Sequence, residues 1–255
     1  MKITVIGSSG STFPGNNLPA FLLDDFMLLD AGTIGIVLDN AAQRKISHIL
    51  ITHAHLDHIN GIPFLVDNII NDKYQNQISV ISVKDVLSEM KKNIFNNKIW
   101  PDFSAIPNKR KPILRYQEIK TIGYLQIRDY KIFATRVTHA VAAYGYIIED
   151  QNANAVVYTG DTGPTEKLWK RMSSHNVRAL IVEVSFPNSM NKLAIETGHL
   201  TPALLEGELR KMIKLPEKIY VSHIKLKHKK VVERELERLG SHSIEVLEGN
   251  TVILL

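Results

Sequence analysis

Three histidines and one aspartate lie within six residues of each other, directly after a short apolar run. Residues Ile49–Thr52, which precede them, have the composition of a short buried strand. Side chains two residues apart on an extended backbone point the same way, so His53 and His55 can bind one metal ion. Asp57 and His58 follow at a turn and can bind a second ion beside it. The full segment reads Thr52-His53-Ala54-His55-Leu56-Asp57-His58.

Isolated residues elsewhere in the chain can complete such a site. Each of them also follows directly after an apolar, strand-like run, and they are His139, Asp161 and His223. We predict two ions that share Asp161 as a bridging ligand. Their other ligands are His53, His55 and His139 for the first ion, and Asp57, His58 and His223 for the second.

The chain has no cysteine among its 255 residues. This excludes disulfide frameworks, thiolate zinc fingers, iron–sulfur clusters and cysteine nucleophiles. Any metal must therefore be held by His, Asp or Glu. Such a ligand set suits Zn²⁺ first, with Mn²⁺ or Fe²⁺ as alternatives.

Composition is ordinary for a globular protein, with 44% hydrophobic and 22% charged residues, which excludes a disordered or fibrous chain. Met1–Gly7 is too short an apolar run for a signal peptide, and no stretch approaches the roughly 20 apolar residues of a membrane span. We therefore predict a cytoplasmic protein with no membrane partner, folded as a single domain over residues 1–255. The net charge of +5 fits an anionic substrate and fits a mildly basic soluble protein equally well.

Short strand-like runs alternate with helical patterns along the chain. Strands are predicted at Ile3–Ile6, Ala20–Leu23, Met27–Leu29, Ile49–Thr52, Ser79–Val83, Leu125–Arg128, Ile132–Val137, Tyr144–Ile148, Val156–Thr159, Leu180–Val184, Ile219–Ser222 and Thr251–Leu254. Helices are predicted at Gly35–Lys45, from Pro63, at Asp85–Phe95, at Thr165–Ser173, from Thr201-Pro202 and at Val231–Leu239. Asn96–Pro112 carries three prolines and should be irregular. The His-rich and Asp-rich positions thus fall on loops that a rigid sheet can hold together.

The order of these ligands along the chain resembles that of the metallo-β-lactamase superfamily. The resemblance implies an α/β fold of the αββα sandwich type, with two mixed sheets face to face, helices outside and the site at one sheet edge. Lactamases of the superfamily often place a cysteine in the second site. With Asp161 at the bridging position and no cysteine, this chain resembles the phosphodiesterase branch instead.

Four further segments resemble the class II 3′,5′-cyclic-nucleotide phosphodiesterases. They are His53–Gly61, Asn93–Phe103, Glu183–Ser189 and Gly198–Pro202. The signature departs at Val66-Asp67, where small residues are expected. The resemblance implies hydrolysis of cAMP or cGMP to 5′-nucleotides, by attack of a hydroxide that bridges two divalent ions. Related enzymes also suggest a homodimer.

His199 is the candidate catalytic residue that is not a metal ligand. It precedes the helix start at Thr201, where free backbone N–H groups favour a phosphate. The resemblance implies that His199 contacts the phosphate and helps protonate the leaving oxygen. Glu183 would orient His199, and Asp57 counts as both ligand and catalytic residue. Three more residues are predicted to line the nucleotide pocket: Asn188, Ser189 and Trp100.

Two smaller predictions concern residues outside this set. Asp30 is either a hydrogen-bond partner of a metal histidine or a residue that favours a turn, and both readings stay open. The remaining histidines do not follow the ligand pattern, so they are predicted to be surface residues: His48, His175, His228 and His242.

The main alternative within the superfamily is a tRNA 3′-processing endonuclease of the tRNase Z type. Its Gly-His-Ser-Thr motif resembles Gly198-His199-Leu200-Thr201 here. The basic segments Lys109–Lys111 and Lys225–Lys230 could meet RNA, although such runs are more typical of a solvated face. A lactonase or thioester hydrolase also fits the metal core. A member that only binds nucleotide or RNA would usually have lost ligands.

Overall fold

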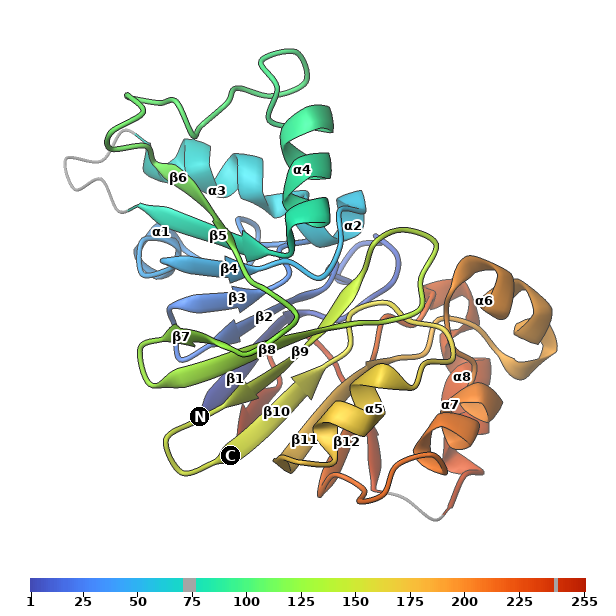
Figure 1. Cartoon of the computed structure of the whole chain (residues 1–255). Coiled ribbons are helices and arrows are strands. Elements are labelled where there is room, and N and C mark those ends of the chain that lie inside the picture. The colour runs from blue at the N-terminus through green and yellow to red at the C-terminus, as the bar shows by residue number, and fades with distance from the viewer. Residues whose placement is uncertain (71–76, 241–242) are drawn as a thin grey trace.

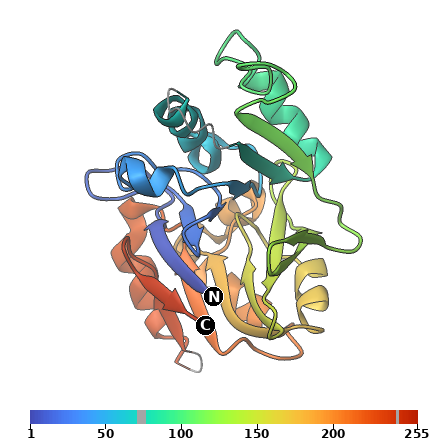
Figure 2. The same ribbon diagram turned by 90° about the vertical axis from the view of Figure 1, so that its left-hand side faces the viewer.

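Two β-sheets face one another in the computed structural model, which describes residues 1–70, 77–240 and 243–255 (Figures 1 and 2). In order across the first sheet, the strands are β14 (Val252–Leu254), β1 (Lys2–Gly7), β2 (Ala20–Leu23), β3 (Met27–Leu29), β4 (His48–Leu50), β5 (Ile78–Ser82) and β6 (Leu114–Glu118). In order across the second, they are β13 (Ile244–Val246), β12 (Lys218–Ser222), β11 (Asn176–Glu183), β10 (Asn154–Tyr158), β9 (Tyr144–Glu149), β8 (Tyr130–Arg136) and β7 (Leu125–Ile127).

Helices cover the outer face of each sheet (Figure 1). On the side of the first sheet they are α1 (Asn40–Gln43), α2 (Leu56–Ile59), α3 (Gly61–Ile69) and α4 (Lys84–Asn93). On the side of the second they are α5 (Lys167–Met172), α7 (Pro202–Leu209) and α8 (Lys229–Glu237). Shorter elements connect them, namely α6 (Asn191–Thr197) and the 3₁₀ turns η1 (Asn188–Met190) and η2 (Leu226–His228). This order of layers is the predicted αββα sandwich.

The core is divided into three apolar clusters by the two sheets. Alternate residues of one strand point to opposite faces of its sheet, so each central strand feeds two clusters. In β4, Ile49 packs against the helices and Leu50 packs between the sheets. In β11, Leu180 faces the helices and Ile181 faces the other sheet. Strands buried on both faces read as continuous apolar runs, which is why the sequence predicts them.

Every predicted strand overlaps an observed one, and the helix predicted at Gly35–Lys45 is longer than the helix found there. Only α1 forms in that region. Asp39 caps it by accepting a hydrogen bond from the Ala42 N–H at 2.8 Å. Before it, the N–H groups of Val37 and Leu38 both turn back to the Ile34 carbonyl. The side-chain cap at Asp39 makes Asn40 the first residue of the helix, which is therefore shorter than predicted.

Several elements were not predicted, and they share weak apolar patterns. The edge strand β6 has only its first residue buried, and β13 has no buried residue. The helix α6 buries only Ala194. Elements with so little buried surface carry no clear period of two or of 3.6 in their sequences.

The strand directions bring the predicted ligands to one end of the sandwich. β4 pairs parallel with β3 and β5, and β11 pairs parallel with β10 and β12. β8 and β10 are both antiparallel to β9, so they share a direction. The segments that follow β4, β8, β10 and β12 therefore meet where the two sheets end. The Thr52 carbonyl accepts from the Tyr144 N–H at 3.0 Å and joins the sheets there.

Candidate metal centre

The structure brings the seven predicted ligands into two groups that share Asp161. In each group the candidate ligand atoms all lie within 4.8 Å of one another. The first group is His53, His55, His139 and Asp161, and the second is Asp57, His58, Asp161 and His223.

Asp161 lies between the groups and directs one carboxylate oxygen to each. Its Oδ2 is 3.7 Å from His53 Nε2 and 4.0 Å from His139 Nε2. Its Oδ1 is 3.3 Å from His58 Nε2 and 3.4 Å from His223 Nε2. These separations are too long for strong hydrogen bonds and leave room for a cation between the atoms.

Three atoms at the middle of the cluster test whether a metal fits. His53 Nε2, His58 Nε2 and Asp161 Oδ1 are buried and have no hydrogen-bond partner among the described residues. A buried polar atom without a partner costs about 1–3 kcal/mol. Divalent cations held by the two groups would satisfy these three atoms, and imidazole nitrogens with carboxylates are the ligands that Zn²⁺ and similar ions prefer. The residues present therefore fit a metal.

Hydrogen bonds to Nδ1 fix the orientation of several of these rings. His53 Nδ1 is 3.0 Å from Thr52 Oγ1, and His139 Nδ1 is 2.8 Å from the Gly198 carbonyl. His223 Nδ1 is 2.9 Å from Ser185 Oγ. An Nδ1 partner of this kind sets the ring's tautomer and leaves Nε2 free for a metal. His55 differs, because its Nδ1 faces the cluster, 3.2 Å from His139 Nε2.

Asp30 holds the fourth ring, that of His58, and lies at the centre of a buried network. Its Oδ2 is 2.7 Å from His58 Nδ1 and accepts from Thr52 Oγ1 at 2.8 Å and Tyr158 OH at 2.7 Å. Its Oδ1 accepts from the Thr52 N–H at 2.8 Å. The residue is fully buried and has a φ of 53°. Of its two predicted roles, the structure therefore shows the hydrogen bond to a candidate ligand, at a left-handed turn after β3.

The pKa shifts in the cluster differ in direction from one residue to the next. Burial alone would lower the pKa of His58, but the carboxylates of Asp161 and Asp30 outweigh burial and raise this pKa well above its usual value. Burial would raise the pKa of Asp161, but His223 and His58 hold it well below its usual value. Burial and the neighbouring His58 lower the pKa of His53. The neutral imidazole of His53 and the ionised carboxylate of Asp161 are the forms that bind metals.

His199 lies beside the ligands, three residues before the first residue of α7. Its Nδ1 is 2.7 Å from Glu183 Oε1, and its ring stacks on that of His223 with 5.6 Å between centroids. Burial would lower the pKa of His199, but the Glu183 carboxylate outweighs it and raises this pKa. Ser185 donates to Glu183 Oε2 at 3.0 Å. The Glu183 carboxylate thus holds the ring of His199 and favours its charged form.

A family model described as a beta-lactamase superfamily domain matches residues 28–226. The chain belongs to the beta-lactamase superfamily. The matched range contains every predicted ligand, so the cluster lies within the superfamily domain.

Curated relatives of two kinds are similar to this chain. A probable 3′,5′-cyclic-nucleotide phosphodiesterase of Yersinia pestis is 25% identical over 190 residues, which cover 67% of this chain and 52% of the relative. The match thus spans about half of that protein. A 3′,5′-cyclic-nucleotide phosphodiesterase of Aliivibrio fischeri is 25% identical over 274 residues, which cover 86% of this chain and 80% of that relative. A ribonuclease Z of Archaeoglobus fulgidus is 24% identical over 293 residues, which cover 92% of this chain and 91% of that relative.

Solved structures of both kinds share the fold. The crystal structure of unliganded yeast PDE1 has a TM-score of 0.85 at 17% identity and covers 100% of this chain and 99% of its own. The crystal structure of the short form of human tRNase Z has a TM-score of 0.71 at 16% identity. It covers 100% of this chain and 99% of its own. These likenesses show that the fold is shared over the whole arrangement of sheets and helices.

The contacts that the structure shows for the three predicted pocket residues involve none of the candidate metal ligands. Asn188 accepts from the Ala203 N–H at 2.7 Å through Oδ1, which satisfies the start of α7. Ser189 is exposed on η1. Trp100 packs edge-on against Phe64, with 5.5 Å between ring centroids. A contact of these side chains with substrate stays a prediction.

The prediction of surface positions is wrong for His175. Its side chain is only 9% exposed, its Nδ1 is 2.9 Å from Glu149 Oε2, and its ring packs on Phe133. An aromatic neighbour and a carboxylate partner from another strand explain this burial, and neither is visible in the local sequence. His48 and His228 are half-buried, and His242 lies outside the described residues.

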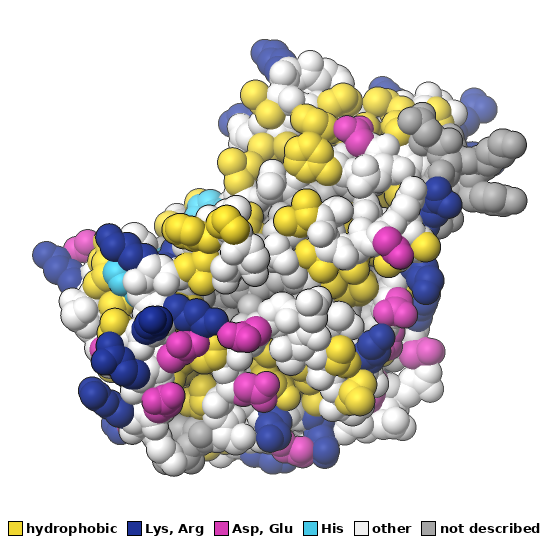
Figure 3. All heavy atoms as spheres, turned by 180° about the vertical axis from the view of Figure 1, so that it is seen from behind, with side chains coloured by type: hydrophobic (Ala, Val, Ile, Leu, Met, Phe, Trp, Pro, Cys, Tyr) yellow, Lys and Arg dark blue, Asp and Glu magenta, His cyan; other side chains and the backbone are white. Residues whose placement is uncertain are grey.

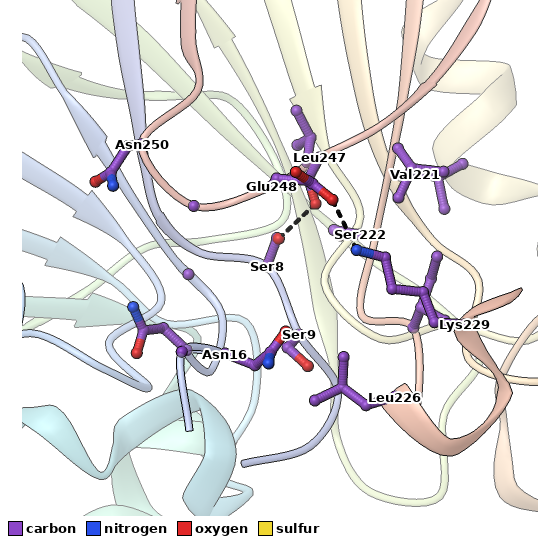
Figure 4. Close-up of a pocket in the computed structure, with 16 residues that line it drawn as sticks. Ser8, Ser9, Asn16, Val221, Ser222, Leu226, Lys229, Leu247, Glu248 and Asn250 are labelled. Atoms are coloured by element: carbon purple, nitrogen blue, oxygen red, sulfur yellow. Dashed lines mark hydrogen bonds and ion pairs between the residues drawn. The ribbon is translucent and has the colours of Figure 1, made fainter. Parts of the chain in front are cut away.

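Two cavities lie near the cluster. The larger, about 560 Å³, reaches from His55 to α4. Seen from behind, the surface is hollowed between the part with α3 and α4 and the part with α6 to α8 (Figure 3). The smaller cavity, about 270 Å³, lies between the ends of β1 and β12 and the segment before β14 (Figure 4). There Lys229 pairs with Glu248 at 2.7 Å and Ser8 donates to the Leu247 carbonyl at 2.7 Å. None of the predicted ligands or catalytic residues lines the smaller cavity.

The described part of the chain contains no helix long and apolar enough to cross a membrane.

Of the two basic segments, Lys109–Lys111 lies in an exposed loop, where Asn108 Oδ1 accepts from the N–H groups of Arg110 and Lys111. In Lys225–Lys230 the charges are divided among different contacts. Lys225 donates to the Gly10 carbonyl at 2.8 Å, while Lys229 pairs with Glu248.

Proposed function

We propose that this protein hydrolyses 3′,5′-cyclic nucleotides to 5′-nucleotides with two divalent metal ions, Zn²⁺ being the first candidate. The observation that carries the proposal is the carboxylate of Asp161 between two ligand groups, with the Glu183–His199 pair beside them. The phosphodiesterase names of the Yersinia pestis and Aliivibrio fischeri relatives support this substrate class.

In this proposal His53, His55 and His139 would hold one ion, Asp57, His58 and His223 would hold the other, and Asp161 would contribute to both. Two such ions, when bound, polarise the phosphate and activate water for in-line displacement. The rings bonded through Nδ1 to Thr52, Asp30, Gly198 and Ser185 keep their Nε2 atoms turned to the centre. These hydrogen bonds exclude the other tautomers before substrate arrives. Less free energy is therefore needed to bring the ligands into the geometry that binds the ions.

His199 supplies the proton in the proposed reaction. Water adds to phosphorus and gives a proton to solvent, the bond from phosphorus to the 3′ oxygen breaks, and that oxygen takes a proton from His199 Nε2, which solvent then restores. Glu183 holds the opposite nitrogen at 2.7 Å and favours the protonated ring. The ring is nearly buried, with 10% of its side chain exposed, so it meets the phosphate on one side only. A positioned general acid of this kind contributes about 10²–10⁴-fold to rate.

Cleavage of a tRNA precursor is the second candidate, because the ribonuclease Z relative of Archaeoglobus fulgidus covers 92% of this chain at similar identity. The same ligand set and the same His199–Glu183 pair serve either phosphodiester. The two substrates differ in size, and a long RNA needs a cationic surface beyond the metal centre. The exposed loop with Lys109–Lys111 is the candidate for such a surface.

The deciding experiment follows product release after the protein is stripped of metal and then reloaded with Zn²⁺ or Mn²⁺. We expect 5′-AMP or 5′-GMP to form from the cyclic nucleotides only after reloading. His199→Ala should reduce turnover by about 100-fold and retain its metal. His48→Ala, which changes a histidine outside the cluster, should match the wild type. Failure to hydrolyse cyclic nucleotides at full metal occupancy, with cleavage of a tRNA precursor, would move the assignment to the second candidate.

A further inference from the structure

The larger cavity extends from the metal centre to one side of α4 and has the size of a small-molecule site. Its volume of about 560 Å³ lies within the roughly 300–1,000 Å³ range of ligand pockets. His55 is part of its wall, so a ligand in the cavity touches the first group of metal ligands. Ile94, Val141 and Ala142 supply apolar wall, and the polar groups come from one face of α4 and its end, namely Lys84, Asp85, Ser88, Glu89 and Asn93. Apolar walls with a few polar groups suit a flat aromatic ring that carries hydrogen-bonding edges.

The polar residues after α4 are mostly occupied in closing their own loop. Asn96 Oδ1 accepts from the N–H groups of Lys98 and Ile99, both at 2.9 Å. Asn97 Oδ1 accepts from the Asp102 N–H at 2.9 Å. These contacts explain why the segment is rich in Asn and Asp without reference to a ligand.

Asn93 differs from its neighbours, because its side chain lines the cavity and contacts Glu89 instead of the loop. Its Nδ2 donates to Glu89 Oε2 at 2.7 Å. With the amide nitrogen turned to the carboxylate, Asn93 Oδ1 and Glu89 Oε1 are left as acceptors, and neither has a partner among the described residues. The pair therefore presents two acceptor oxygens from one helix face, one of them charged.

We propose that this cavity takes the base of the nucleotide and that the Glu89–Asn93 pair selects guanine over adenine. The inference rests on the proposed function and names its preferred substrate, cGMP. Guanine carries two donors side by side, the N1–H and the 2-amino group, and these match two acceptor oxygens. Adenine sets an acceptor, N1, beside its single amino group, so its N1 lone pair would face the carboxylate. A bond to a charged acceptor is stronger than one to a neutral acceptor.

The test compares kinetics and direct binding in one set of variants. For the metal-loaded wild type we expect kcat/KM for cGMP to exceed that for cAMP about tenfold, the ratio that one charged hydrogen bond near solvent supports. Glu89→Gln should remove this preference mainly by raising KM for cGMP, and Asn93→Ala should reduce it. Asp67→Asn is the matched control: Asp67 is an exposed acid on the neighbouring helix α3 and does not line the cavity.

Binding of 5′-GMP and 5′-AMP, measured by calorimetry, separates the two proposals. If cyclic nucleotides are hydrolysed with equal kcat/KM, or if Glu89→Gln leaves the ratio unchanged, the guanine inference is overturned and the proposed function stands. If neither nucleotide is hydrolysed, the proposed function is lost. In that case tighter binding of 5′-GMP that Glu89→Gln abolishes would still support the base site, and equal binding of both products would overturn it.

Discussion

Replacing Asp30 by asparagine should weaken metal binding without changing any candidate ligand. The carboxylate oxygen Oδ2 accepts three hydrogen bonds, from His58, Thr52 and Tyr158, in a fully buried position. An amide of the same shape can place its NH₂ group there. The two hydroxyl groups can rotate to become acceptors, but a protonated Nδ1 cannot. His58 must then move its proton to Nε2, the atom that faces the metal site.

The magnitude follows from the bond that is lost. A hydrogen bond between a ring N–H and a buried carboxylate contributes about 1.5–3 kcal/mol. At about 1.4 kcal/mol per factor of ten, this corresponds to a loss of roughly 10–150-fold in affinity for the ion held by His58. Removal of such an orienting partner typically costs about 10–100-fold. The network of Asp30 also stabilises the fold, so the metal-free variant should lose about 1–3 kcal/mol in its free energy of unfolding.

Metal affinity is measured by competition with a chromogenic chelator, and stability by urea unfolding of the metal-free protein. Asp39→Asn makes the same chemical change at an exposed cap of α1, where asparagine caps a helix as well as aspartate. It should match the wild type in both assays. An Asp30→Asn variant that binds both ions within twofold of the wild type would refute the role assigned to Asp30.

Three further predictions concern the surroundings of the centre. Gly198→Ala should lower both the melting temperature and the metal affinity, because Gly198 has a φ of 70° and an added Cβ would lie 2.7 Å from His139 Cα. An unchanged melting temperature in calorimetry and an unchanged affinity in chelator titration would contradict this. Tyr158→Phe should reduce the free energy of unfolding by about 1 kcal/mol and preserve metal affinity, since the carboxylate of Asp30 remains; urea unfolding checks it. Removal of metal by a chelator should lower the melting temperature, because a cation at about 1,000 times its Kd adds about 4 kcal/mol of stability; calorimetry that shows no shift would contradict metal binding.

The strands could be predicted because they are buried on both faces. β2 and β3 have the residues predicted for them, Ala20–Leu23 and Met27–Leu29, and all their side chains are buried. The edge strand β6, with sequence Leu-Arg-Tyr-Gln-Glu, buries one residue and was missed. The sequence pattern thus reports buried surface, and elements that bury little carry little signal.

The candidate ligands could be named from the sequence because four of them are nearly consecutive and the others follow apolar runs. The residues that orient the ligands could not be named from the sequence, because the contacts between them and the ligands join distant segments of the chain. Tyr158 reaches Asp30 across 128 positions, and Ser185 reaches His223 across 38. One signal was available for Tyr158: a tyrosine at the end of an apolar strand, whose buried hydroxyl needs a partner. The carbonyl of Gly198 gives no such signal, since any residue has one.

The position of the site at the meeting of two sheets explains why its parts depend on one another. His53, His55, Asp57 and His58 follow a strand of the first sheet, whereas His139, Asp161 and His223 follow strands of the second. A cation shared by these residues therefore joins the two sheets at the end where the sandwich opens. The contacts that orient the rings cross the same boundary, since Tyr158 of the second sheet donates to Asp30 of the first. Metal affinity and the packing of the sheets are consequently coupled, and a substitution that shifts one sheet against the other weakens both.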